Sequence, residues 1–134
     1  MKSKNSLLTC LKKRDILNRD EIDSQALVDY GSRYLRFELL NDALDFFEKA
    51  QHSEGISKIK DLAIQSGDLF LYKRCCSILG TRENKKELLE LAERAISYGK
   101  MSFASQVYET LGETRKAKAL KDGLSEDIPV SGNA

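Results

Sequence analysis

The most reactive side chains of this 134-residue sequence belong to one histidine and three cysteines. General acid or base catalysis needs a titratable group held beside a second reacting group. His52 stands alone in the turn-like segment "QHSEG", so we expect a surface or capping role for it. Because no catalytic constellation is recognisable, the sequence predicts a protein that is not an enzyme.

The cysteines favour a reducing compartment over a disulfide framework. Their number is odd, and a bridge between the adjacent Cys75 and Cys76 would close a strained ring. Disulfides are rare in cytosolic proteins, so we expect a cytoplasmic location. With one histidine and no Cys-x-x-Cys spacing we expect no metal site. No glycine-rich loop follows a strand, so we also expect no cofactor.

Charge is balanced along the sequence. Lysine and arginine total 22 against 21 acidic residues, so no net field attracts nucleic acid or an anionic membrane. Basic residues are denser at the start and in "RKAKALK", but the interleaved aromatic residues of a nucleic-acid surface are missing. No apolar run approaches the roughly 20 residues that span a bilayer. We expect no nucleic acid and no membrane among the partners.

The pattern from Asp23 to Lys121 is helical almost throughout. Apolar residues recur at helical spacing, as in Ala43, Phe46, Phe47 and Ala50 of the segment "NDALDFFEKA". Four glycines follow such segments and are expected to end helices in the left-handed conformation: Gly67, Gly80, Gly99 and Gly112. Helix N-caps are expected at Ser53 and Thr81. No stretch alternates long enough to predict a strand.

The helical segments also repeat. The segments "SGDLFLYKRCCSILGTRENKKELL" and "YGKMSFASQVYETLGETRKAKALK" align without a gap, at an offset of 32 residues that places Gly67 on Gly99. An offset of 29 places Phe47 of the preceding unit on Cys76, which we therefore expect to be a buried core residue. A period of about 20 to 50 residues with two helices per unit is typical of a stacked helical array.

The stretch "ALVDYGSRYLRFELLNDALDFFEKA" resembles a tetratricopeptide (TPR) motif over both of its helices. In that family the first helix of a unit (helix A) carries a bulky residue, a large-small pair and an aromatic residue. The second helix (helix B) carries a small, an aromatic and another small residue. The matching residues here are Leu27, Tyr30-Gly31 and Tyr34 on helix A, and Ala43, Phe47 and Ala50 on helix B. Gly31 and Ala43 are expected to let the helices approach, while Tyr34 and Phe47 fill the space between units.

The later units depart from this pattern. Lys60 takes the small position of the second unit, and Tyr72 replaces its helix B alanine. The resemblance implies an all-α fold, an α-α superhelix (a TPR-like solenoid) of about three hairpins with a charged C-terminal capping helix. We expect a basic arm or short capping helix over residues 1–22, the repeat domain over residues 23–123 and a flexible tail over residues 124–134.

The resemblance also implies where a partner would bind. The concave face of a TPR-like array is lined by helix A residues that packing between units does not use. The candidate protein-binding residues are Val28, Ser32, Leu35, Arg36, Asp61, Ile64, Leu89, Glu93 and Ile96. Leu35, Ile64 and Ile96 fall at one equivalent position, where an apolar ladder would suit an extended peptide or a partner helix. The alternative is that these three pack against neighbouring helices.

Some TPR proteins grip the acidic C-termini of chaperones with a basic and asparagine clamp on this face. The matching positions here hold Val28, Ser32, Ser57 and Asp61, so that activity is not carried over. We therefore expect a non-enzymatic module that binds an unidentified protein or peptide on its concave face. The alternative is a structural protein that self-associates through the ends of the array as a homo-oligomer.

Overall fold

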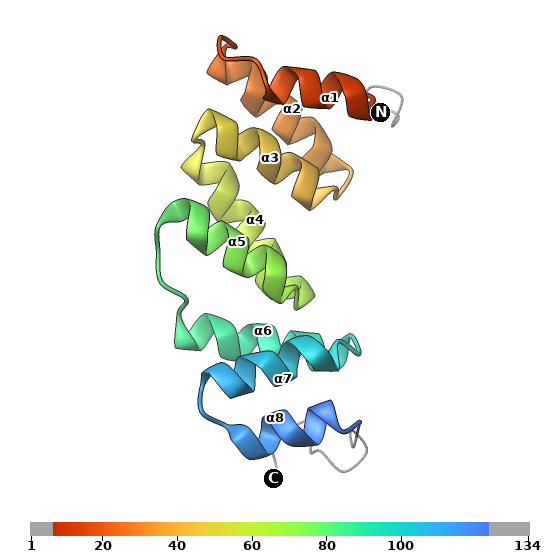
Figure 1. Ribbon diagram of the computed structural model, residues 1–134, viewed down its shortest axis with the longest axis vertical. Helices are drawn as coiled ribbons and strands as arrows, with labels where there is room; N and C mark the ends of the chain where they lie inside the picture. Colours follow the sequence, from red (N-terminus) through yellow and green to blue (C-terminus); the bar gives the residue numbers. More distant parts are fainter. Residues whose placement is uncertain (1–6, 124–134) are drawn as a thin grey trace. The chain divides into compact units, whose positions relative to one another are not determined.

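The computed structural model describes residues 7–123, which form eight α-helices and no strand (Figure 1). In chain order these are α1 (Cys10–Leu17), α2 (Ser24–Arg36), α3 (Leu40–Ala50), α4 (Ser53–Ser66), α5 (Leu69–Leu79), α6 (Lys85–Ser97), α7 (Met101–Thr110) and α8 (Thr114–Lys121). The all-α prediction is confirmed. Within the described range, no helix has the length and apolar character needed to cross a membrane.

The chain divides into two compact units, Met1–Ile59 and Lys60–Ala134, and the division falls inside α4. The predicted arm over residues 1–22 contains a helix, α1, whereas the predicted tail over residues 124–134 lies outside the described residues. The first helices of the three predicted hairpins begin at Ser24, Ser53 and Lys85, 29 and 32 residues apart. These spacings reproduce the offsets of the sequence repeat.

Side-chain caps fix several helix starts. Asp23 accepts a hydrogen bond from the N–H of Gln25 at α2, and Asp68 accepts one from Leu71 at α5. Such a cap satisfies an N–H that has no partner within the helix. The caps predicted at Ser53 and Thr81 are wrong. Ser53 is already helical, because the N–H of Ile56 donates to the carbonyl of His52, and α6 is capped by Asn84, three residues after Thr81.

The predicted glycines do end their helices in the left-handed region. The φ angles of Gly67, Gly80, Gly99 and Gly112 are 69°, 70°, 77° and 82°. In the first unit the same conformation is adopted by Glu38 and Gln51, with φ of 59° and 54°. A residue with a Cβ pays about 1–2 kcal/mol for this conformation, so these two chain reversals depend on the packing of the helices that they join.

The core of the first unit is aromatic and lies between α2 and α3, which form an antiparallel hairpin (Figure 1). The ring of Phe46 stacks on Tyr30 and on Tyr34, with centroid distances of 5.4 Å in both pairs. Ala43 and Phe47 are buried, as the repeat register predicted, and Phe47 lies against Gly31. Offset stacking of this kind contributes about 0.5–1.5 kcal/mol per pair beyond the buried area.

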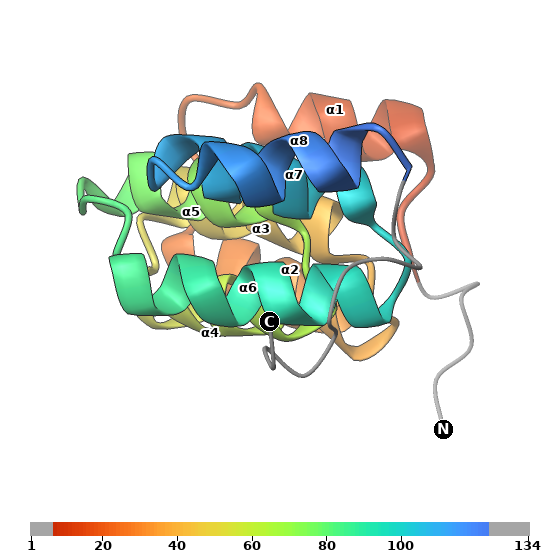
Figure 2. The same ribbon diagram turned by 90° about the horizontal axis from the view of Figure 1, so that it is seen from below.

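The core of the second unit is aliphatic. On α6 the buried face consists of Leu88, Leu91, Ala92 and Ala95. Figure 2 shows α8 beside α7, and the buried hydroxyl of Ser105 on α7 donates a 2.8 Å hydrogen bond to the carbonyl of Ala117 on α8. The basic side chains of α8 are exposed, at Arg115, Lys116, Lys118 and Lys121. The predicted final helix with a charged outer face is therefore present.

Candidate functional site

The candidate residues of the first unit lie on the side of α2 that the hairpin does not bury. Val28, Ser32 and Leu35 are half-buried, and Arg36 is exposed. Their spacing of four and three residues places the first three along one face of the helix. The neighbouring set, one residue earlier at each position, is Leu27, Gly31 and Tyr34, and it is buried. Packing therefore leaves an apolar-polar-apolar strip along α2.

α6 repeats this arrangement. Leu89 and Ile96 are half-buried and Glu93 is exposed, again at spacings of four and three residues. Each lies 61 residues after its counterpart on α2, which is the combined offset of the two repeat steps. The two helices thus carry a similar accessible strip at equivalent positions of the first and third repeat hairpins.

α4 differs at the apolar position. Asp61 is exposed, but Ile64 is only 5% exposed. A side chain with so little accessible surface serves packing and offers a partner almost no contact area. Of the three equivalent apolar residues, Leu35 and Ile96 are the accessible ones.

The cysteines and the histidine take structural positions. Cys75 and Cys76 are buried in α5, whereas Cys10 is exposed at the start of α1. Burial, followed by the neighbouring Cys76, raises the pKa of Cys75 to about 11, so the thiol stays protonated near neutral pH. The ring of His52 lies 5.3 Å from that of Phe47, next to the start of α4. Cys75 and Cys76 therefore belong to the packed core, and the ring of His52 packs on Phe47.

One polar network in the second unit was not predicted. The hydroxyl of Tyr72 donates to Glu87 Oε1 at 2.8 Å and accepts from the N–H of Asn84 at 3.0 Å. Lys60 Nζ lies 3.4 Å from Glu87 Oε2. Burial raises the pKa of Tyr72, and the side chain is 0% exposed. The network joins α4, α5 and α6 around the buried Tyr72 and helps to hold these helices together.

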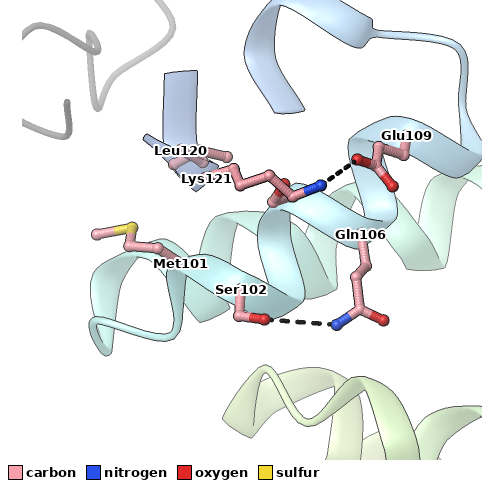
Figure 3. A pocket seen from close by; sticks show the side chains of 7 residues that line it. Met101, Ser102, Gln106, Glu109, Leu120 and Lys121 are labelled. Atoms are coloured by element: carbon pink, nitrogen blue, oxygen red, sulfur yellow. Dashed lines mark hydrogen bonds and ion pairs between the residues drawn. The ribbon is translucent and has the colours of Figure 1, made fainter. Parts of the chain in front are cut away.

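A pocket of about 410 Å³ lies between α7 and α8 (Figure 3). Four of its polar side chains form two pairs, Gln106 with Ser102 at 3.5 Å and Lys121 with Glu109 at 3.2 Å. Met101 and Leu120 supply apolar surface. Because its two charges offset each other, the pocket has no net charge with which to select a ligand, and it contains none of the predicted site residues.

Over residues 7–123 there is no group of three or more histidine, cysteine or acidic side chains that could hold a metal ion. The fold and these residues define an all-α protein of consecutive helices with accessible strips on α2 and α6. Comparison with protein-family models, curated proteins and solved structures finds no match to the chain.

Proposed function

We propose that this chain is a TPR-like interaction module that binds a protein through the accessible faces of its helix A segments. The observation that carries the proposal is the equivalence of two strips, Val28, Ser32 and Leu35 on α2 and Leu89, Glu93 and Ile96 on α6. In both helices the buried residues lie on the neighbouring face, one residue before each member of the strip. A repeated apolar-polar-apolar strip suits an extended peptide or an amphipathic helix.

The superhelical order of the hairpins belongs to the same proposal. It is supported by the helix starts at 29- and 32-residue spacing and by the packing of Gly31 against Phe47. Each strip would receive apolar side chains of the ligand, at Leu35 on α2 and at Ile96 on α6. Arg36 and Glu93 flank these contacts with opposite charges and would orient a partner of complementary charge.

Quantitative affinity purification tests this function. The immobilised chain is compared with a Leu35→Glu, Ile96→Glu double variant, using extract from cells that make the protein. Leu11→Glu, Phe70→Glu is the matched control, because Leu11 and Phe70 are apolar and 63% and 66% exposed but lie outside the two strips. Ile64 is left unchanged, since a charge at this buried position would test folding.

We expect at least one protein to be captured equally by the wild type and the control. The captured amount of this protein should be at least tenfold lower with the strip variant. If the strip variant keeps its helical circular dichroism and captures the same proteins, the proposed surface is wrong. Light scattering tests self-association directly. A stable dimer at tens of micromolar that dissociates in the strip variant would assign the strips to contacts between copies of the chain.

A further inference from the structure

The attachment of α1 to the first unit buries little apolar surface. Ile16 is its one buried side chain, at 7% exposure, and Leu11 on the same helix is 63% exposed. Burying one such side chain contributes about 1.5–3 kcal/mol, which is small against the cost of ordering a helix of eight residues. Polar contacts must therefore supply much of the specificity with which α1 docks.

Lys13 makes those polar contacts. Its Nζ lies 2.6 Å from Asp42 Oδ1 and 2.7 Å from Asp45 Oδ2, two carboxylates on α3. The same ammonium group lies 5.9 Å from the centroid of the Tyr34 ring. The Tyr34 hydroxyl in turn donates a 3.3 Å hydrogen bond to the carbonyl of Leu8, just before α1. A single lysine therefore contacts two carboxylates and an aromatic ring.

The surface beneath α1 is held in place by the α2–α3 hairpin itself. Tyr34 stacks on Phe46, whose ring is fully buried. Asp42 and Asp45 are three residues apart on α3, on a helix fixed by the burial of Ala43, Phe46 and Phe47. Because none of these supports comes from α1, the surface keeps its shape when α1 leaves.

We propose that Tyr34, Asp42 and Asp45 form a binding surface for a basic helix of a partner protein, and that α1 is a displaceable lid over it. α1 is the template for that ligand. It carries Lys12, Lys13 and Arg14 against one acidic residue, Asp15, and its buried Ile16 stands three residues after Lys13. The partner helix presents a basic residue and an aliphatic residue at the same spacing.

Whether α1 or a partner helix occupies the surface depends on the strength of the ion pairs and on the covalent connection of α1 to the chain. Partly exposed ion pairs contribute about 0–1 kcal/mol each. A tethered segment competes at an effective concentration of the order of millimolar. A partner helix longer than α1 gains further contacts and overcomes this advantage. This surface is distinct from the α2 and α6 strips, and the proposal does not rest on the function proposed for them.

A fluorescent peptide of residues 7–19 with Cys10→Ser tests the proposal on the full chain by anisotropy titration. Lys13→Ala in the chain removes the lid's ionic contacts and leaves the surface intact. We expect this variant to bind the peptide at least tenfold more tightly than the wild type does. Adding Asp42→Asn and Asp45→Asn should reverse the gain, whereas adding Asp29→Asn, an exposed carboxylate of α2, should not.

Three outcomes would overturn the proposal: no binding by the folded Lys13→Ala chain, equal binding by the wild type and this variant, or binding unaffected by the two asparagines. A peptide carrying Lys13→Glu is the control for charge and should not bind. A fluorophore on the exposed Cys10 of the wild type reports on the lid directly. Its anisotropy should fall when excess unlabelled peptide displaces α1, and a constant value would contradict the lid.

Discussion

The ring of Phe47 on α3 lies so close to Gly31 on α2 that a Cβ at Gly31 would stand 2.6 Å from Phe47 Cε1. Gly55 on α4 meets the other edge of the ring, where an added Cβ would stand 2.7 Å from Cδ2. Two glycines on two helices therefore make room for one aromatic side chain. This is the role that the TPR resemblance assigned to Phe47.

Gly31→Leu is expected to destabilise the chain by about 3 kcal/mol, at the upper end of the usual range for overpacking. The gain in helix propensity on replacing glycine is at most about 1 kcal/mol and does not compensate. Urea unfolding followed by circular dichroism measures the change. Ser32→Leu, at the next and half-buried position, is the control and should change stability by much less. A Gly31→Leu chain as stable as the wild type would contradict the contact.

Tyr72→Phe removes the hydroxyl that links Asn84 and Glu87 and leaves the N–H of Asn84 without this acceptor. We expect a loss of about 1–3 kcal/mol, the usual cost of an unsatisfied buried polar group. Denaturant unfolding again provides the measurement. Tyr98→Phe is the control because Tyr98 is exposed. Equal stabilities of the two variants would show that the Tyr72 hydroxyl contributes nothing.

The network around Glu87 shows which kind of contact cannot be predicted from helical spacing. Lys60 and Tyr72 look like two separate departures from the repeat pattern, but in the folded chain both contact Glu87. Their compatibility depends on a third residue on another helix, and helical spacing contains no information about that contact. The interaction of Lys13 with Asp42 and Asp45 was hidden for the same reason, since these residues are 29 and 32 positions apart.

Features set by local chemistry were predictable. The helical spacing of Ala43, Phe46 and Phe47 gave the buried face of α3, and the glycine positions gave four helix ends. Gln51 lies in the segment "QHSEG" that the sequence marked as turn-like, but the left-handed conformation of Glu38 and Gln51 was not predicted, because neither residue type favours it. At the candidate site, Ile64 has the same residue type and register as Ile96, and only packing makes one buried and the other accessible.

Ser105→Ala should loosen α8, because the buried Ser105 hydroxyl is bonded to the carbonyl of Ala117. The expected loss is about 1 kcal/mol, typical of one intramolecular hydrogen bond. Hydrogen exchange should accelerate in α8 more than in α6. Ser102→Ala is the matched control, since Ser102 is exposed on the same helix. If exchange in α8 does not change, the bond does not hold this helix in place.

The buried thiol of Cys75 predicts a loss of stability at alkaline pH. Burial raises the pKa of Cys75 in the folded chain to about 11, above the ordinary value of 9.0. Between these values the unfolded chain has released the thiol proton and the folded chain has kept it. The stabilisation is therefore complete below pH 9 and is lost as the pH rises toward 11, with a slope of up to about 1.4 kcal/mol per pH unit.

Cys75→Ala should remove this component of the slope, even though the lost sulfur lowers stability at every pH. Urea unfolding at pH 8, 9 and 10 measures the slope, and Cys10→Ala is the control because Cys10 is exposed. The control should keep the wild-type slope, which also includes a contribution from Tyr72, whose pKa is likewise raised by burial. Identical slopes for Cys75→Ala and the wild type would show that the Cys75 thiol ionises as easily in the folded chain as in the unfolded one.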